Sequence, residues 1–355
     1  MTSDAISAHI RSQLAPLVTA IDEEGFYPEA FLRGLGPLGG FVGYEDLARQ
    51  IEVTTEVGRL CGATAFLVWC QSTCAWYLRQ APNEAVRERY LAPIARAELL
   101  AGTGMSNPVK HLAGIENINL LARRDGDSYV VNGTLPWVSN VGPGHIAMVA
   151  AAVENDGYAM LATPCGAEGI ALLPCPKFSG LEGTRTRSLR FADYRVEPDH
   201  VLAHPNEFAA FIRRIKPGFL LGQTGIGFGI VEGSLRDIRA ASAGRAHVNV
   251  YLDHQGPDLA EELSALQAQA QVLSKATQGG RGPILEALKL RARVSELALK
   301  ATQSAALHAG AKGYLMRHPA QRRLREALFV AIVTPALKHL RKEIQDLERT
   351  QAAAA

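Results

Sequence analysis

Apolar residues recur every three or four positions near both ends of the chain and alternate with polar residues in the middle. Over residues 1–98 this spacing predicts a series of amphipathic helices. Residues 63–78, "ATAFLVWCQSTCAWYL", are apolar almost all round, which predicts a buried helix. From about residue 205 onward the helical spacing returns. The pattern therefore predicts a helical part, a β part and a second helical part, in that order.

The middle of the chain consists of short alternating segments separated by Gly, Pro, Asn and Asp. Such runs, with turn residues between them, are typical of a compact β domain. Within "YVVNGTLPWVSN" (129–140), Asn132-Gly133 is a preferred hairpin turn, so we expect a hairpin whose second strand carries Trp137. The strand candidates are residues 125–133, 145–153, 158–164, 170–176 and 188–196.

Four long helices are predicted in the last part of the chain, and alanine-rich faces on three of them favour close helix packing. We therefore predict an α+β multidomain fold. An N-terminal all-α domain spans residues 1–98, a middle β-barrel or sandwich domain residues 99–204, and a C-terminal four-helix bundle residues 205–355. The four helices are expected at residues 211–242, 259–277, 283–310 and 322–350.

Composition narrows the class of protein. A formal net charge of +2 gives no reason to expect a nucleic-acid partner. The five cysteines are an odd number in a long chain, which favours reduced thiols over a disulfide framework. No uncharged apolar run reaches the roughly 18 residues of a membrane span, and no charged-then-apolar leader opens the chain. We therefore expect a cytoplasmic protein without a membrane partner.

Several local motifs carry little chemistry by themselves. The glycines of "GQTGIGFG" (222–229) lack the G-x-G-x-x-G spacing and lie in a helical context, so they indicate close helix packing more than a phosphate loop. Cys70 and Cys74, and likewise His200 and His204, are four residues apart, but no further ligands follow, and no metal site is predicted.

A basic cluster opens the first helix of the predicted bundle. Arg213, Arg214 and Lys216 lie close together in "FIRRIKP". Such a cluster is usually a solvated helix face. The alternative is a contact to the phosphate of a ligand that lies beside the bundle.

Three longer stretches resemble one family. "DGDSYVVNGTLPWVSN" (125–140) is similar to the Asp-x-Tyr-x-Ile/Leu-Asn-Gly-x-Lys-x-Trp-Ile-Thr/Ser-Asn segment of the acyl-CoA dehydrogenases. "GTGMSNP" (102–108) resembles their stretch ending in Thr/Ser-Glu-Pro, and "HAGAKGYLMRHPAQRRLREA" (308–327) resembles their Gly-Gly-x-Gly-Tyr…Pro…Arg-Asp run. The resemblance covers nearly the whole chain. It implies the order α, β, α and an oxidoreductase that carries FAD.

The resemblance also implies a cofactor site. In the family the matching tryptophan packs against the flavin ring, and the neighbouring hydroxyl forms a hydrogen bond near the reactive N5. An isoalloxazine ring needs such a stacking face and fixed hydrogen-bond donors. Backbone at two further positions would hold the pyrimidine side, and an arginine would reach the flavin phosphates of the neighbouring subunit. The implied residues are Trp137, Ser139, Met105, Ser106, Arg245, Gly310 and Gly313.

The family's catalytic base has no match. Family members remove the α-proton of a thioester with a glutamate, and that position aligns with Thr334, or with Ile215 in members that carry the base earlier. Neither side chain can act as a base near neutral pH. The nearest histidine, His339, lies five residues further on, which is more than one helical turn. Two other carboxylates could swing in, Glu326 and Glu182, although we expect Glu326 to pair with an arginine.

Substrate contacts are expected on the buried helix and on the basic cluster. Trp69 and Gln71 would make the pocket aromatic and mildly polar, and Arg213 and Lys216 are the candidate phosphate contacts. The resemblance implies a small-molecule substrate such as a CoA thioester and a homodimer or homotetramer.

Three functions remain open from the sequence. The first is an FAD-dependent oxidoreductase that acts on an acyl thioester or a similar small molecule without the usual base. The second is a reduced-flavin-dependent monooxygenase. The third is a catalytically inactive relative that serves as a subunit or binding protein.

Overall fold

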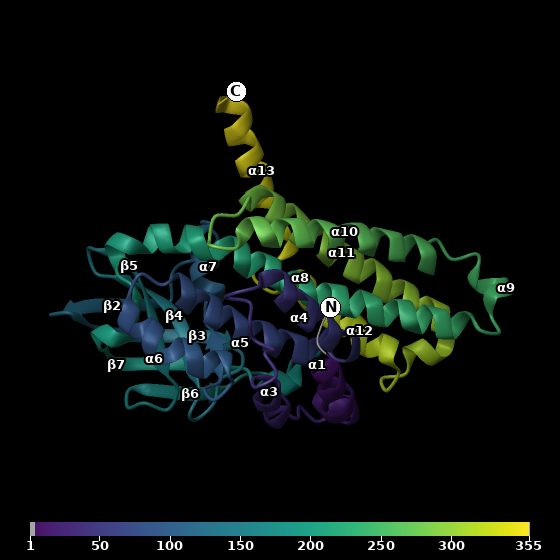
Figure 1. The fold of residues 1–355 in the computed structure, drawn as a ribbon, viewed down its shortest axis with the longest axis horizontal. Helices are drawn as coiled ribbons and strands as arrows, with labels where there is room; N and C mark the ends of the chain where they lie inside the picture. The colour runs from purple at the N-terminus through teal and green to yellow at the C-terminus, as the bar shows by residue number, and fades with distance from the viewer. Residues whose placement is uncertain (1–3, 355) are drawn as a thin grey trace.

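A computed structural model describes residues 4–354, in which helices, a β-sheet and a second set of helices follow one another along the chain (Figure 1). The first helical stretch is irregular around Pro16, as the residue's missing N–H leads one to expect. The N-terminal elements are α1 (Asp4–His9), a π-helical turn (Ile10–Leu14), a 3-10 turn (Ala15–Leu17), α2 (Val18–Glu23), α3 (Glu29–Leu35), α4 (Leu47–Leu60), α5 (Gly62–Gln80) and α6 (Glu84–Ala95).

Helix α5 confirms the predicted buried helix, because every residue from Gly62 to Leu78 is buried. Helix α6 begins at an asparagine cap, where the Asn83 side chain accepts a hydrogen bond from the Ala85 N–H at 3.1 Å.

The middle of the chain forms the expected β part. The described residues contain one eight-stranded sheet in the order β6-β7-β3-β2-β4-β5-β8, with β1 paired to β4. The β1–β4 and β2–β4 pairs are parallel and the other pairs are antiparallel. The elements are β1 (Ala101–Thr103), α7 (Ser106–Leu112), β2 (Leu120–Asp125), β3 (Ser128–Val138), β4 (Ile146–Val153), β5 (Gly157–Pro164), β6 (Ile170–Pro174), a 3-10 turn (Glu182–Thr184), β7 (Arg187–Val196), a 3-10 turn (Pro198–His200) and β8 (Val201–Ala203).

The hairpin predicted at Asn132-Gly133 is wrong, because both residues lie inside strand β3. The chain reverses earlier, where Asp125 of β2 pairs with Ser128 of β3 across a two-residue turn. Gly133 instead marks an irregularity in the β3–β7 register and has a φ of +127°. A Cβ there would lie 2.2 Å from the Asn119 carbonyl oxygen, so the close approach of two backbones explains this glycine.

The last part of the chain forms the bundle, in which α8, α10 and α11 lie side by side (Figure 1). The fourth predicted helix is wrong in one respect, because residues 333–336 divide it in two. Pro335 has no N–H to continue a helix, which accounts for the break. The elements are α8 (Pro205–Ser242), α9 (Ala246–Asn249), α10 (Gly256–Thr277), α11 (Ile284–Ala309), a 3-10 turn (Gly310–Tyr314), α12 (Pro319–Ile332) and α13 (Leu337–Ala354).

The glycines of α8 confirm the expected close helix packing. A Cβ at Gly229 would lie 2.4 Å from the Thr55 carbonyl oxygen of α4, and one at Gly227 would lie 2.4 Å from the Val294 side chain of α11. Helices of the N-terminal part and of the bundle therefore share one apolar core, while the sheet has a second core of its own.

The fold class is thus the expected one, a helical domain, a sheet domain and a second helical domain. The exact boundaries after residues 98 and 204 stay predictions. Among the described residues, no helix has the length and apolar character that a bilayer crossing would require.

Candidate functional site

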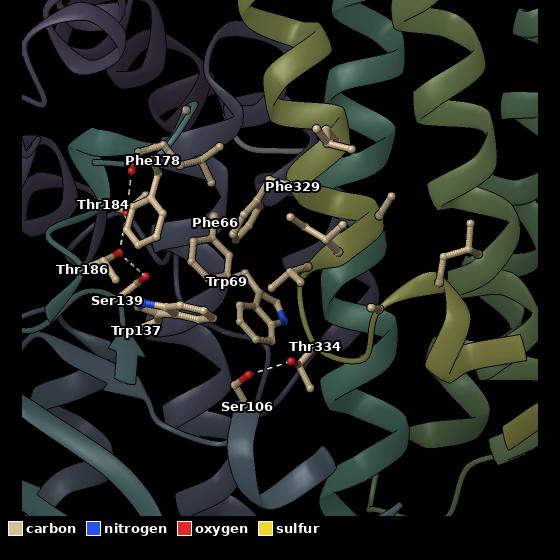
Figure 2. Close-up of a pocket in the computed structure, with 18 of the residues that line it drawn as sticks. Phe66, Trp69, Ser106, Trp137, Ser139, Phe178, Thr184, Thr186, Phe329 and Thr334 are labelled. Carbon is tan, nitrogen blue, oxygen red and sulfur yellow. Dashed lines mark hydrogen bonds between the residues drawn. The ribbon is translucent and has the colours of Figure 1, made fainter. Parts of the chain in front are cut away.

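A cavity of about 830 Å³ lies where the sheet meets helix α5 and the connection between α12 and α13. Its wall is strongly aromatic, with side chains from four separate parts of the chain facing one another (Figure 2). These side chains are Phe66 and Trp69 of α5, Trp137 of β3, Phe178 of the loop after β6, and Phe329 of α12. The cavity is therefore shaped for a flat apolar group.

Trp137 is presented to this cavity by an irregular strand end. Leu135 pairs with Leu189 and Val138 with Arg187, so β3 carries one extra residue between these two pairs. Trp137 has a left-handed φ of +57°, which is uncommon for a bulky residue and marks a β-bulge. Its side chain is 60% exposed, and its ring meets Phe178 edge to face at 6.3 Å. The bulge thus leaves an open aromatic face beside the cavity.

A chain of three hydroxyls lies beside this ring (Figure 2). Thr184 Oγ1 donates to the Leu181 carbonyl at 2.7 Å, Thr186 Oγ1 lies 2.8 Å from Thr184 Oγ1, and Ser139 Oγ lies 2.6 Å from Thr186 Oγ1. A carbonyl can only accept, so it fixes the direction of the chain: Thr186 donates to Thr184, and Ser139 donates to Thr186. Ser139 therefore presents a hydrogen-bond acceptor to a neighbour.

Thr334 lies on the cavity wall formed by the α12–α13 connection (Figure 2). Its hydroxyl is 2.7 Å from the Ser106 hydroxyl, at the start of α7. The Thr334 carbonyl accepts a hydrogen bond from the Gln223 side chain of α8 at 3.0 Å. Contacts from two different elements therefore fix this position.

A buried arginine supports the same wall from behind. Arg291 of α11 is fully buried and donates to the Gln223 side chain at 2.8 Å, to the Val330 carbonyl at 2.7 Å and to the Ser295 hydroxyl. All three acceptors are neutral. Burial without a carboxylate partner lowers the pKa of the Arg291 guanidinium to about 10.

The charged groups on the cavity wall are cationic, and no Asp or Glu is among its described lining residues. Three of the cations have carboxylate partners: Lys110 pairs with Glu116, Arg325 with Asp22, and Arg341 with Glu296. Lys338 and His339 also line the cavity.

The two carboxylates considered from the sequence do not line the cavity. Glu326 accepts a hydrogen bond from the Gly62 N–H at 2.9 Å and pairs with Arg322 at 3.3 Å, as expected. Glu182 accepts a hydrogen bond from the Phe178 N–H.

His339 is the residue that sequence reasoning set aside. The expectation that it is more than a helical turn from Thr334 assumed one continuous helix. Because the chain breaks at residues 333–336, His339 lies in the first turn of α13 and lines the same cavity as Thr334. Burial, and then the nearby Lys338 and Lys110, lower its pKa, while Glu116 acts in the opposite direction. Pro335 is the residue in the sequence that could have indicated this position of His339, because a proline predicts a helix break.

A second cavity of about 280 Å³ adjoins the first. The two share Met105, Phe219 and His339 in their walls. Ile215 and Lys216 of α8 line the second cavity, and Lys216 forms an ion pair with Glu343 of α13.

The structure therefore brings together most of the predicted site residues of one chain. Those on the main cavity are Met105, Ser106, Trp137, Ser139, Trp69 and Thr334, and those on the second cavity are Met105, Ile215 and Lys216.

Two predicted substrate contacts lie elsewhere. Gln71 is buried, and its amide donates to the Ile94 and Leu99 carbonyls and accepts from the Ala101 N–H at 2.8 Å. It ties α5 to the sheet and does not line either cavity. Arg213 is exposed on α8 and also lines neither cavity, which agrees with the solvated-face interpretation.

Three predicted cofactor residues lie where α9 begins and α11 ends, and α9 lies at the end of the bundle away from the sheet (Figure 1). Arg245 donates to the Ala309 carbonyl at 2.9 Å, and a Cβ at Gly310 would lie 3.5 Å from the Arg245 guanidinium. Gly313 follows in the same turn. Within one chain these residues do not line either cavity.

No group of three or more His, Cys, Asp or Glu within residues 4–354 is arranged to hold a metal ion. Cys70 and Cys74 are buried. His200 contacts Tyr90, and His204 lies 2.9 Å from the Tyr129 hydroxyl.

The main cavity fits the flavin ring that the resemblance implies. Trp137 offers an open indole face for the ring, and the Ser139 hydroxyl beside it offers an acceptor, which N5 can meet when the flavin is reduced and carries a hydrogen there.

The chain is similar to known proteins along most of its length. The family "Acyl-CoA dehydrogenase, N-terminal domain" matches residues 1–98. The short-chain specific acyl-CoA dehydrogenase of Clostridium acetobutylicum is 23% identical over 344 residues, which cover 90% of both chains.

Solved structures share the fold over nearly the full length. Butyryl-CoA dehydrogenase from Megasphaera elsdenii superimposes with a TM-score of 0.85 at 21% identity, covering 97% of this chain and 96% of that one. A glutaryl-CoA dehydrogenase from Mycobacterium smegmatis in complex with FADH2 superimposes with a TM-score of 0.79 at 16% identity, covering 97% and 92%. The chain is therefore similar to acyl-CoA dehydrogenases along nearly its whole length, and it shares their fold.

Proposed function

We propose that this protein is an FAD-dependent oxidoreductase that acts on an acyl thioester without the glutamate base of its relatives. The observation that carries this proposal is the aromatic cavity in which the open face of Trp137 lies next to the hydroxyl of Ser139. When bound there, FAD would supply the oxidising power by accepting a hydride from the substrate.

The chain's own residues would orient that cofactor and exclude water. Trp137 would cover one face of the ring, and the Ser139 hydroxyl would fix its polar edge. Backbone at Met105 and Ser106, which close the cavity next to Thr334, would hold the opposite edge. Phe66 and Trp69 would leave an apolar space for the reacting carbon atoms.

No Asp or Glu is among the described residues that line the main cavity, which supports the proposal that the glutamate base is missing. Thr334 has a hydroxyl that is already hydrogen-bonded to Ser106, and Ile215 offers only carbon atoms to the second cavity. The usual family reaction would therefore lack its proton acceptor at both known positions.

A CoA thioester is the proposed substrate class. Lys216 lines the second cavity, where it could meet a phosphate if its ion pair with Glu343 opened. Gln71 and Arg213 have no part in this proposal, because neither lines a cavity.

A homodimer or homotetramer is the proposed assembly. The far end of the bundle exposes several large apolar side chains, which a second subunit would cover. Arg245 and Gly310 lie at this end, where they could complete the cofactor site of that subunit. The exposed apolar residues are Val248, Val250, Tyr251, Tyr314, Leu315 and Met316. Light scattering that gave only a 38 kDa species at micromolar concentration would contradict this assembly.

The reaction is tested by anaerobic mixing of the FAD-loaded protein with isobutyryl-, butyryl- and octanoyl-CoA. The proposal predicts that one of these thioesters bleaches the visible absorbance of the flavin. A protein that binds FAD and keeps its full absorbance with all three would contradict a thioester oxidation.

The direction of the hydroxyl chain favours a second candidate function, a reduced-flavin-dependent monooxygenase. Ser139 presents an acceptor, and N5 of a flavin carries a hydrogen only when the flavin is reduced. In this case product would form only when a flavin reductase and O2 are both present, and the flavin absorbance would not change in the anaerobic mixture.

A further inference from the structure

One imidazole lies in the wall that the two cavities share. His339 lines both the cavity that contains Trp137 and the smaller one that contains Ile215. Its Nδ1 is enclosed by protein atoms and has no hydrogen-bond partner among the described residues. The ring as a whole is only half-buried, so Nε2 is the nitrogen that can exchange a proton with an occupant of a cavity.

Most of the other titratable groups around this ring form ion pairs; Tyr77, whose pKa is raised by burial, lines the smaller cavity. Lys110 pairs with Glu116, Lys216 with Glu343, and Lys342 with Asp346. Arg325 and Arg341 on the main cavity have carboxylate partners of their own, Asp22 and Glu296. Lys338, the preceding residue, also lines the main cavity. Lysine and arginine are protonated near pH 7 and cannot accept a proton.

We propose that His339 is a catalytic residue that takes the proton from the α-carbon of the acyl thioester, in place of the missing glutamate. This inference rests on the proposed function. It assigns the proton acceptor to a position five residues beyond Thr334, which the break between α12 and α13 brings to the same cavity.

The proton transfer is balanced within the site. The α-carbon–hydrogen bond breaks, and its electron pair stays on the substrate, spread onto the thioester carbonyl oxygen. The proton forms a new bond to a neutral ring nitrogen of His339, which becomes imidazolium. Burial and the neighbouring lysines keep the ring neutral at pH 7, as a base must be, since they lower its pKa.

The test measures exchange of the α-proton for deuterium, a reaction that requires no oxidation of the substrate. The FAD-loaded protein is incubated without oxygen in heavy water with acetyl-, butyryl- and octanoyl-CoA, and deuterium at the α-carbon is measured by mass spectrometry. Wild-type protein is expected to catalyse the exchange with one of the three. His339→Gln should reduce the rate by about 10²–10⁴-fold. Arg190→Gln, on an exposed position of β7 that lines neither cavity, serves as the control and should leave the rate unchanged.

A change of pH adds a readout that a merely structural role would not move. The wild-type rate should rise with pH along a limb centred below 6.5, as His339 loses its proton. Lys338→Met should shift this limb to higher pH, because the lysine's charge lowers the pKa of His339.

Failure of this proposal is distinguishable from failure of the proposed function. A wild-type protein that exchanges no thioester, or a His339→Gln variant that exchanges at the wild-type rate, would overturn the role of His339. In either case, the FAD content of the same samples shows separately whether the protein binds the cofactor. The glutamine substitution should fold normally, because the imidazole has no side-chain hydrogen bond to lose.

Discussion

At the scale of single residues, the proposed function depends most on position 334, where the resemblance places the family's glutamate. Thr334 lines the main cavity, and two polar contacts fix it there. A carboxylate at this position would therefore extend from an ordered backbone into the cavity. Thr334→Glu is the single change that would restore the family's base.

In a His339→Gln background, which removes the proposed proton acceptor, we expect Thr334→Glu to raise the rate of flavin reduction by butyryl- or octanoyl-CoA above that of the single variant. General-base catalysis supplies about 10²–10⁴-fold when the base is well placed, and the double variant should recover part of this range. Stopped-flow absorbance measures the rate. Thr334→Gln in the same background has nearly the same shape without the charge and should stay slow. A double variant no faster than His339→Gln alone would show that a carboxylate at position 334 does not reach the reacting carbon.

The sequence predicted residues whose role depends on a local motif and missed those that depend on tertiary contacts. Trp137 and Ser139 were predictable because both belong to one continuous stretch, and the structure places both on the main cavity. Gln71 could not be placed, since its burial depends on carbonyls about 25 residues away. His339 was missed because its distance from Thr334 depends on where a helix ends.

At the scale of elements, the connection between α12 and α13 positions the site. Gln223 of α8 holds the Thr334 carbonyl, and Arg291 of α11 holds both Gln223 and the last turn of α12. These bonds run from two helices of the bundle to one wall of the cavity. The pattern of apolar residues predicted the helices, but it could not predict this network, because Arg291 is a charged residue in a fully buried position.

We expect Arg291→Met to lower the free energy of unfolding by about 2–4 kcal/mol. The change leaves the Val330 carbonyl and the Gln223 side-chain oxygen unpaired in the interior, at about 1–3 kcal/mol each, and the recovered desolvation of the guanidinium offsets part of this loss. Urea titration followed by circular dichroism gives the value. Arg293→Met, on the exposed face of the same helix, is the control and should stay within about 0.5 kcal/mol of the wild type. An Arg291→Met variant as stable as the wild type would show that the network does not anchor the wall.

Turn signals were the least reliable element-scale prediction. Asn132-Gly133 looks like a hairpin turn, yet the glycine serves a close backbone approach within a long strand. The actual turn between β2 and β3 uses Gly126, which has a φ of +64°. Both sites satisfy the local preference for glycine, and only the pairing of the strands decides between them.

At the scale of the whole molecule, buried histidines make stability depend on pH. Burial lowers the pKa of His145, His200 and His339 below the usual 6.5. The unfolded chain therefore takes up protons near pH 6 that the folded protein does not bind. The neutral histidines contribute fully to the free energy of unfolding above pH 6.5, and this contribution is lost as the pH falls below that value.

We expect the free energy of unfolding to fall between about pH 7 and pH 5, by at most about 1.4 kcal/mol per pH unit for each of the three groups. Urea titrations at several pH values measure the slope. His145→Gln should reduce this slope, and His247→Gln, which changes an exposed ring, should not. Stability that is constant or higher at pH 5 would contradict the lowered pKa values.

The central claim is that Trp137 covers a bound flavin, and FAD binding by the wild type, Trp137→Phe and Trp137→Ala tests it most directly. Titration of each protein with FAD, followed by flavin fluorescence, gives the dissociation constants. The account predicts tight binding by the wild type, a small loss for Trp137→Phe, and a loss of about 10–100-fold for Trp137→Ala, because the ring's apolar face would no longer be covered. A wild-type protein that binds no FAD, or a Trp137→Ala variant that binds it as tightly as the wild type, would contradict the account.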